Sequence, residues 1–260
     1  MSVISLVNLK GGVAKTVSTI NLAAAMAKEG KRVLIIDTDS QGNIATAMGM
    51  QPDSITYSLA NLMSKAIEDE VAEQEILQCI VHRENVDILP SNSLLAALDT
   101  ALMNAMCRES VLKSISDRLK GQYDYILIDC PPSLGVIVKN ALVASDYTLI
   151  PVEAHYLCFE SLRSMLDTIR LVKLKLNPAL EIAGIFLTMY QSRTNLGREI
   201  KELIQGTYGK DIRVFDDCIP YSIKAAEQTL YGKSIIDLNP KHPVAVGYMN
   251  IAKELMENGS

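Results

Sequence analysis

The sequence lacks tryptophan, contains few other aromatic residues and has no long hydrophobic run. Aromatic residues make up 5% of the 260 residues, whereas hydrophobic residues as a class make up 48%, so we expect aliphatic strands and helices rich in alanine, leucine and methionine to form the core. The apolar stretches are all shorter than the roughly 20 residues of a membrane-spanning helix. The apolar run near the N-terminus is also too short for a signal peptide. These absences predict a soluble, cytoplasmic protein.

Cysteine is also scarce, and basic residues are not in excess. The five cysteines are far apart and include no C-x-x-C pair, which argues against both a disulfide framework and a zinc site. The formal net charge is −5. A protein with this balance does not coat nucleic acid through bulk positive charge, although a local basic patch is compatible with it.

The stretch that organises the chain is N-L-K-G-G-V-A-K-T, at residues 8–16. It follows an apolar run that predicts a strand and precedes an alanine-rich stretch that predicts a helix ending near Gly30. Paired glycines, a helix N-terminus and Lys15 suit phosphate binding, and the Thr16 hydroxyl suits Mg²⁺. The strict pattern G-x-x-x-x-G-K-[ST] is not met, because Leu9 and Ala14 hold its glycine positions. Taken alone, the stretch could be a glycine turn with solvated lysines.

Carboxylates follow two further apolar runs. Asp37 and Asp39 come directly after residues 33–36, and Asp129 ends the strand predicted at residues 123–129. Side chains at the carboxyl ends of buried parallel strands lie where open α/β sheets bind ligands. A carboxylate in this position can hold Mg²⁺ against phosphates. The residues themselves therefore predict a magnesium-dependent nucleotide hydrolase.

The remaining pattern predicts one α/β domain over residues 1–260. Helical spacing indicates helices at 58–68, 73–80, 94–105, 108–120, 159–176 and 243–257, and apolar runs indicate strands at 86–90, 147–152 and 181–187. We expect the P-loop NTPase class, with a mostly parallel, twisted sheet and helices on both faces.

Three ordered motifs resemble those of one family over nearly the whole chain. K-G-G-V-A-K-T at residues 10–16 resembles the deviant Walker A motif of the ParA/MinD group. D-T-D-S-Q-G-N at residues 37–43 resembles the family's switch segment, with Ser40 in place of the usual proline, and I-D-C-P-P-S-L-G at residues 128–135 matches its Walker B region. The chain thus resembles the ParA/Soj-like DNA-partitioning ATPases. That resemblance implies ATP and Mg²⁺ as cofactors, an ATP-dependent homodimer, nonspecific double-stranded DNA, a ParB-like centromere-binding partner and association with the nucleoid.

The resemblance also implies roles for particular residues. Lys10 would reach the phosphates bound by the opposite subunit, and Asp39 would orient or activate the attacking water, so that Lys10, Lys15 and Asp39 form the catalytic set. The implied nucleotide contacts are Lys10, Gly11, Gly12, Val13, Ala14, Lys15, Thr16, Val17, Pro220 and Ser222. The implied metal site comprises Thr16, Asp37, Asp39 and Asp129.

Two basic positions correspond to those with which the family grips the DNA backbone. They are Arg193 in R-T-N-L and Lys224 in I-P-Y-S-I-K, where Tyr221 stands in place of the family's first arginine. Charge is balanced near the C-terminus, so DNA affinity would depend on arrangement and on dimerisation.

Of three other functions, the sequence disfavours two and leaves one open. A MinD-like positioning ATPase would need a membrane-binding tail, but the last predicted helix carries Glu254 and Glu257 beside Lys253, so we expect it to dock on the domain and bind no membrane. An electron-transfer ATPase of the nitrogenase iron-protein type would need cluster ligands that the cysteine spacing does not offer. A nucleotide-binding scaffold without hydrolysis is compatible with Ser40. We expect no helix-turn-helix extension before the first strand.

Overall fold

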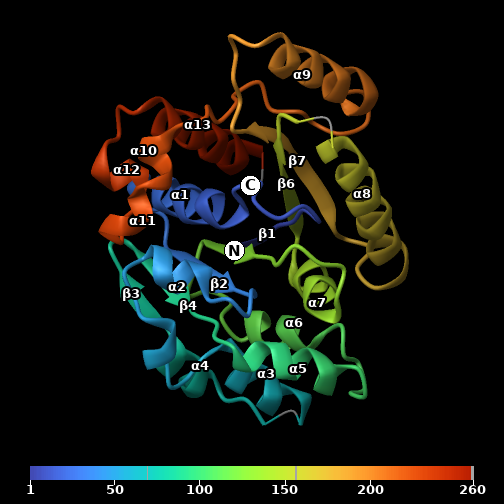
Figure 1. Cartoon of the computed structure of the whole chain (residues 1–260). Helices are drawn as coiled ribbons and strands as arrows, with labels where there is room; N and C mark the ends of the chain where they lie inside the picture. The colour runs from blue at the N-terminus through green and yellow to red at the C-terminus, as the bar shows by residue number, and fades with distance from the viewer. Residues whose placement is uncertain (69, 156, 259–260) are drawn as a thin grey trace.

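A seven-stranded sheet forms the centre of the computed structural model, which describes residues 1–68, 70–155 and 157–258 (Figure 1). The strands are β1 (Ser2–Leu6), β2 (Val33–Asp37), β3 (Val81–Arg83), β4 (Val86–Leu89), β5 (Tyr125–Asp129), β6 (Tyr147–Glu153) and β7 (Glu181–Thr188). Their order in the sheet is β3-β4-β2-β5-β1-β6-β7. The β3–β4 pair is antiparallel and the other pairs are parallel, which confirms the prediction of a mostly parallel sheet.

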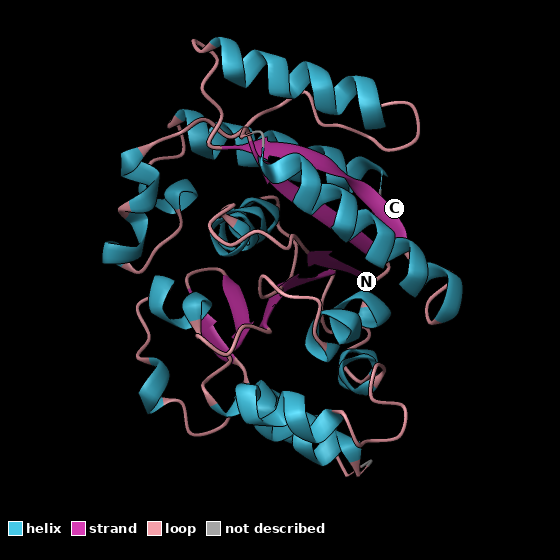
Figure 2. Cartoon of the chain, turned by 45° about the vertical axis from the view of Figure 1, so that its right-hand side comes forward, coloured by secondary structure: helices cyan, strands magenta, loops and turns pink. Residues whose placement is uncertain are grey.

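Helices cover both faces of this sheet (Figure 2). They are α1 (Lys15–Lys28), α2 (Asn43–Ala47), α3 (Leu59–Ile67), α4 (Glu73–Cys79), α5 (Leu94–Leu102), α6 (Val111–Asp117), α7 (Val136–Ala144), α8 (Leu157–Lys175), α9 (Asn195–Tyr208), α10 (Ile223–Ala226), α11 (Gln228–Tyr231), α12 (Ile235–Leu238) and α13 (Pro243–Asn258), with a 3₁₀ turn at Pro52–Ser54.

The apolar run of β2 is continuous because both faces of this strand are buried. All five of its residues are buried. Leu34 and Ile36 belong to the hydrophobic layer with α3 and α5 to α8, whereas Val33 and Ile35 belong to the layer with α1 and α13. Because successive side chains of a strand point to opposite faces, a strand covered on both sides has no polar alternation.

The predicted helices and strands are present, with some changes of length. The helix predicted at 108–120 is reduced to α6, because residues 108–110 form a turn in which the backbone N–H of Ser110 donates to the carbonyl oxygen of Cys107. The sequence pattern missed the edge strand β3, the helices α2, α7 and α9, and the short helices α10, α11 and α12. β3 has only three residues, and α7 follows a segment rich in proline and glycine that is typical of a loop.

The C-terminal helix α13 docks on the domain as predicted. Its apolar stripe, Val244, Tyr248, Ile251 and Leu255, is buried in the layer that contains α1. The hydroxyl groups of Tyr248 and Ser18 share a hydrogen bond of 2.9 Å, which ties the two helices together. Within the described residues, every helix is too short or too polar to cross a bilayer.

Candidate nucleotide site

The loop between β1 and α1 turns through two left-handed residues. Gly12 has a φ of 78° and Ala14, which caps α1, has a φ of 61°. Glycine adopts such angles without strain, whereas alanine there is held by the surrounding structure. Among the described residues, no side chain caps the helix start. The first N–H groups of α1 are therefore available to an external anion.

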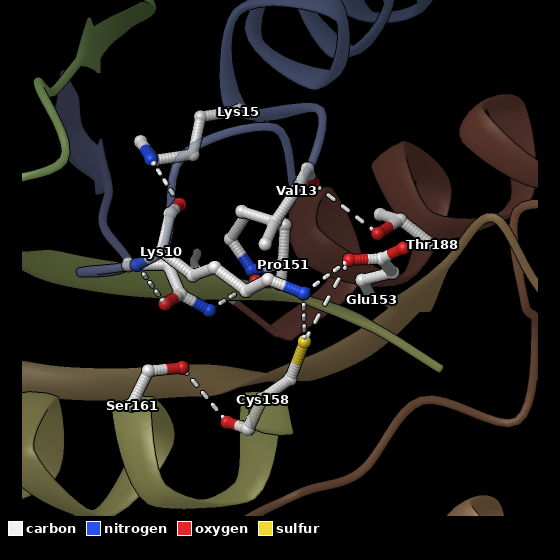
Figure 3. Close-up of polar contacts among 9 residues, drawn as sticks. Lys10, Val13, Lys15, Pro151, Glu153, Cys158, Ser161 and Thr188 are labelled. Carbon is white, nitrogen blue, oxygen red and sulfur yellow. Dashed lines mark hydrogen bonds and ion pairs between the residues drawn. The ribbon is translucent and has the colours of Figure 1, made fainter. Parts of the chain in front are cut away.

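Lys15 is the first residue of α1 and lies over this loop. Its side chain is buried, and its Nζ donates a hydrogen bond of 3.0 Å to the carbonyl oxygen of Lys10 (Figure 3). Burial lowers the pKa of Lys15, while the charges of Asp129 and Asp39 act in the opposite direction. An anion placed at the loop would favour the charged form of this lysine and give it a better partner than a carbonyl.

Thr16, Asp37 and Asp129 meet at the carboxyl ends of neighbouring strands. Asp37 and Asp129 are register partners at the ends of β2 and β5. Asp129 accepts hydrogen bonds from the Thr16 hydroxyl at 2.7 Å and the Thr19 hydroxyl at 3.3 Å. Asp37 accepts from the backbone N–H groups of Asp39 and Ile44. The structure thus brings the predicted metal residues Thr16, Asp37 and Asp129 together.

Both buried carboxylates have raised pKa values. Burial raises the pKa of Asp37 well above its ordinary value, and the charge of Asp129 raises it further. Burial also raises the pKa of Asp129 to about 7, although the hydrogen bond from Thr16 and the charge of Lys15 oppose this shift. A divalent cation would relieve the repulsion between the two carboxylates.

Asp39 is set apart from this pair. It is half-buried, and its Oδ1 accepts a hydrogen bond of 3.0 Å from the backbone N–H of Gln41 in its own loop. In the described part of the chain, acidic, histidine and cysteine side chains do not gather in threes to hold a metal ion. Mg²⁺ does not need such a cluster, because it is usually held by one or two protein oxygens together with phosphate and water. The Thr16 hydroxyl and the buried carboxylates therefore fit Mg²⁺, with Asp39 at their edge.

Replacing Asp129 with asparagine should stabilise the ligand-free chain above neutral pH. The folded pKa of about 7 exceeds the ordinary 3.8, so the folded chain retains a proton that the unfolded chain releases, and the free energy of unfolding of the wild type falls as pH rises between these values. Asparagine does not titrate, and its amide can still pair with the threonine hydroxyls. Urea denaturation should give Asp129→Asn an advantage of roughly 2 to 4 kcal/mol at about pH 8. This gain should shrink as pH falls below about 7, and a gain independent of pH would contradict the assignment.

A largely apolar cavity of about 220 Å³ lies beside the start of α1. The predicted contacts Ala14, Val17, Pro220 and Ser222 line it. So do residues that the sequence reasoning missed: Thr188, Met189, Ile219, Tyr221, Ile223, Ala225, Val244 and Tyr248. Apolar walls with a few hydroxyl groups suit a planar heterocycle such as adenine.

Thr188 links this cavity to the phosphate loop. It is the last residue of β7, it is buried, and its hydroxyl donates a hydrogen bond of 3.2 Å to the carbonyl oxygen of Val13. The signal that could have revealed it is its place at the carboxyl end of a parallel strand, the same position that identified Asp37 and Asp129.

The two predicted DNA-binding residues lie on segments that touch. Tyr190 and Pro220 form a parallel bridge, in which the backbone N–H of Tyr190 donates to the carbonyl oxygen of Ile219. Arg193 follows three residues after this bridge and Lys224 four residues after it, and both are exposed. The bridge brings together two segments that are far apart in the sequence.

Comparison with known proteins identifies the family of this chain. Residues 1–182 match a family model described as an AAA domain. The chain is 38% identical over 257 residues to the sporulation initiation inhibitor protein Soj of Bacillus subtilis, covering 99% of each. It is 37% identical over 255 residues to the chromosome partitioning protein ParA of Myxococcus xanthus, covering 98% of this chain and 88% of that protein.

A solved structure shares the whole fold. Cobyrinic acid a,c-diamide synthase from Mycobacterium smegmatis, with a bound ATP analogue and magnesium, superposes with a TM-score of 0.86 at 29% identity, covering 100% of this chain and 97% of that chain. The near full-length similarity to Soj and ParA, together with the deviant phosphate loop and the carboxylates at the strand ends, places this chain in the ParA/Soj family of P-loop ATPases.

Proposed function

We propose that this chain is a DNA-partitioning ATPase that binds ATP with Mg²⁺ and closes into a homodimer. The observation that carries the proposal is the meeting of Lys15, Thr16 and two buried carboxylates at one edge of the sheet, beside an apolar cavity. The chromosome-partitioning relatives support the function. The bound ATP analogue and magnesium of the structural neighbour support the cofactors.

Each part of the nucleotide has a candidate contact in this chain. The cavity beside Val17 and Pro220 would take the adenine, and the loop from Gly11 to Thr16 would take the phosphates. Thr16 and Asp129 would hold Mg²⁺, with Asp37 as a second carboxylate. When bound, Mg²⁺ neutralises charge on the phosphates.

The chain's own residues would then orient and stabilise the reacting groups. Lys15 would exchange its bond to the Lys10 carbonyl for phosphate oxygens and so stabilise negative charge in the transition state. Asp39, whose carboxylate accepts a hydrogen bond from a backbone N–H of its own loop, would orient the attacking water. Lys10 would reach the phosphates of the opposite subunit. Hydrolysis is expected to be slow until a ParB-like partner completes this arrangement.

DNA binding would follow from dimerisation. Arg193 and Lys224 give each subunit a small cationic patch that contacts phosphate without reading bases. Two weak patches joined in one dimer bind far more tightly than a single patch, so ATP would switch DNA binding on and hydrolysis would release it. Such a protein would associate with the nucleoid.

The test is binding to nonspecific duplex DNA without nucleotide, with ADP and with ATP plus Mg²⁺. Wild type is expected to bind with ATP only. The double variant Arg193→Glu/Lys224→Glu should lose at least about tenfold in affinity, and its binding should depend less steeply on salt, because fewer phosphate contacts are made.

A matched control reverses two exposed lysines elsewhere, Lys31 before β2 and Lys173 on α8. Lys31→Glu/Lys173→Glu changes the net charge equally and should retain ATP-dependent binding. Equal losses of DNA affinity in both variants would show that DNA binding depends on the overall charge of the protein and not on this patch. Absence of binding in every nucleotide state would rule out the proposed cargo.

A further inference from the structure

Lys10 is held within its own subunit at both its backbone and its side chain. Its backbone N–H donates to Asn8 Oδ1 at 3.0 Å. Its Nζ donates to Glu153 Oε2 at 2.6 Å and to Cys158 Sγ at 3.2 Å (Figure 3). Glu153 ends β6 and Cys158 lies in the first turn of α8, so the junction of these two elements forms the cradle.

Asn8 fixes the loop to the same junction. Its side chain is buried, and its Nδ2 donates a hydrogen bond of 2.8 Å to the carbonyl oxygen of Pro151 in β6. The backbone of Lys10 is therefore tied to β6 through Asn8, while its ammonium group is tied to the end of the same strand through Glu153. The backbone and the ammonium group of Lys10 are therefore both fixed relative to β6.

The cradle neutralises the charge of Lys10. The hydrogen bond from Lys10 to Glu153 raises the pKa of the lysine, against the opposing effect of burial. The Lys10 and Glu153 side chains are 31% and 29% exposed, and the thiol of Cys158 is fully buried. Partial removal from water makes the pair stronger than a fully exposed ion pair.

A lysine whose ammonium group is paired with a carboxylate of its own subunit cannot at the same time reach a phosphate bound by another subunit. We propose that Glu153 is a positioning residue that holds Lys10 back in the free subunit, so that this pair must break when two subunits close over ATP. The inference rests on the proposed function, because it takes the role of Lys10 across the dimer interface from there. Glu153 thereby sets the protein concentration at which the dimer forms.

The strength of the Lys10–Glu153 ion pair sets the expected change in the dimer dissociation constant. A partly exposed ion pair shifts an equilibrium by up to roughly fivefold, and two such pairs must open in each dimer. Glu153→Gln should therefore lower the dimer dissociation constant by about 3- to 25-fold. Analytical ultracentrifugation with a non-hydrolysable ATP analogue and Mg²⁺ measures this constant directly.

Three further variants separate positioning from a general structural effect. Glu153→Asp keeps the charge and should restore most of the wild-type constant. Glu160→Gln changes the net charge equally on the exposed side of α8 and should leave the constant unchanged. In a Lys10→Ala background, Glu153→Gln should have no effect, because the partner that it restrains is absent. Weaker dimerisation of Glu153→Gln, or the same gain in the Lys10→Ala background, would overturn the proposal.

A second measurement uses the free subunit. After reductive methylation with ¹³C-formaldehyde, NMR follows the titration of the Lys10 amine, which should occur at lower pH in Glu153→Gln than in wild type or Glu160→Gln. Identical titration in all three would show that the pair is not formed in solution. If titration depends on Glu153 but wild type stays monomeric with the analogue, the proposed dimer fails, and the role of Glu153 in closure fails with it.

Discussion

Lys15→Ala is expected to lower the affinity for ATP by about 30- to 1,000-fold, which corresponds to roughly 2 to 4 kcal/mol. Lys15 is buried at the start of α1, and its ammonium group donates a hydrogen bond to the carbonyl oxygen of Lys10, 3.0 Å away. A charged donor held in a partly dehydrated site interacts strongly with phosphate, and alanine leaves no replacement. Titration with a fluorescent ATP analogue in the presence of Mg²⁺ gives the dissociation constant.

The control for this prediction lies at the other end of the same helix. Lys28 is exposed at the last position of α1, and Lys28→Ala removes the same charge from the chain. It should bind ATP like the wild type. If Lys15→Ala kept an affinity within about threefold of the wild type, the loop at residues 10–16 would not be the phosphate site.

The parts of the site that could be predicted are those whose signal is local. Lys15, Thr16 and the glycine turn are neighbours in sequence, and Asp37 and Asp129 each end an apolar strand. A strand's own residues show that it is buried, and parallel strands bring their carboxyl ends to one edge. The sequence pattern was thus enough to place these carboxylates near the phosphate loop.

The parts that could not be predicted depend on contacts between distant residues. Lys10 and Glu153 are 143 positions apart, and nothing in either segment indicates that the cradle exists. Thr188 meets Val13 across 175 positions. Such contacts depend on the packing of β6, β7 and α8 beside β1, which no local pattern encodes.

Ala14 shows the limit of local preference. Its φ of 61° belongs to a region in which glycine is the usual residue, and the strict phosphate-loop pattern has glycine here. Tertiary structure imposes the conformation on alanine instead, through the carbonyl of the preceding residue, which accepts a hydrogen bond from Thr188. The fold therefore keeps the loop shape where the sequence departs from the pattern.

Asp39→Ala is expected to slow ATP hydrolysis by about 100-fold or more while ATP is still bound. The three aspartates differ in their surroundings, since Asp37 and Asp129 are fully buried among donors whereas Asp39 is half-buried. Its carboxylate accepts a hydrogen bond from the backbone N–H of Gln41, in the same loop. Removing it costs the fold little and leaves Lys15, Thr16 and Asp129 in place.

Measuring nucleotide affinity together with phosphate release distinguishes a partition ATPase from a nucleotide-binding scaffold. If Asp39 orients the attacking water, as proposed, Asp39→Ala should accumulate as a long-lived ATP dimer that stays on DNA, seen as slow phosphate release beside normal nucleotide affinity. Asp39→Asn keeps the oxygen that accepts from Gln41 but lacks the charge, and so should be equally slow if the carboxylate acts on water. Normal phosphate release in both variants would remove Asp39 from the mechanism. If the wild type itself released no phosphate even with DNA and its partner present, the chain would be a nucleotide-binding scaffold. Ser40, which stands where the family usually has proline, would then be the first residue to replace with proline.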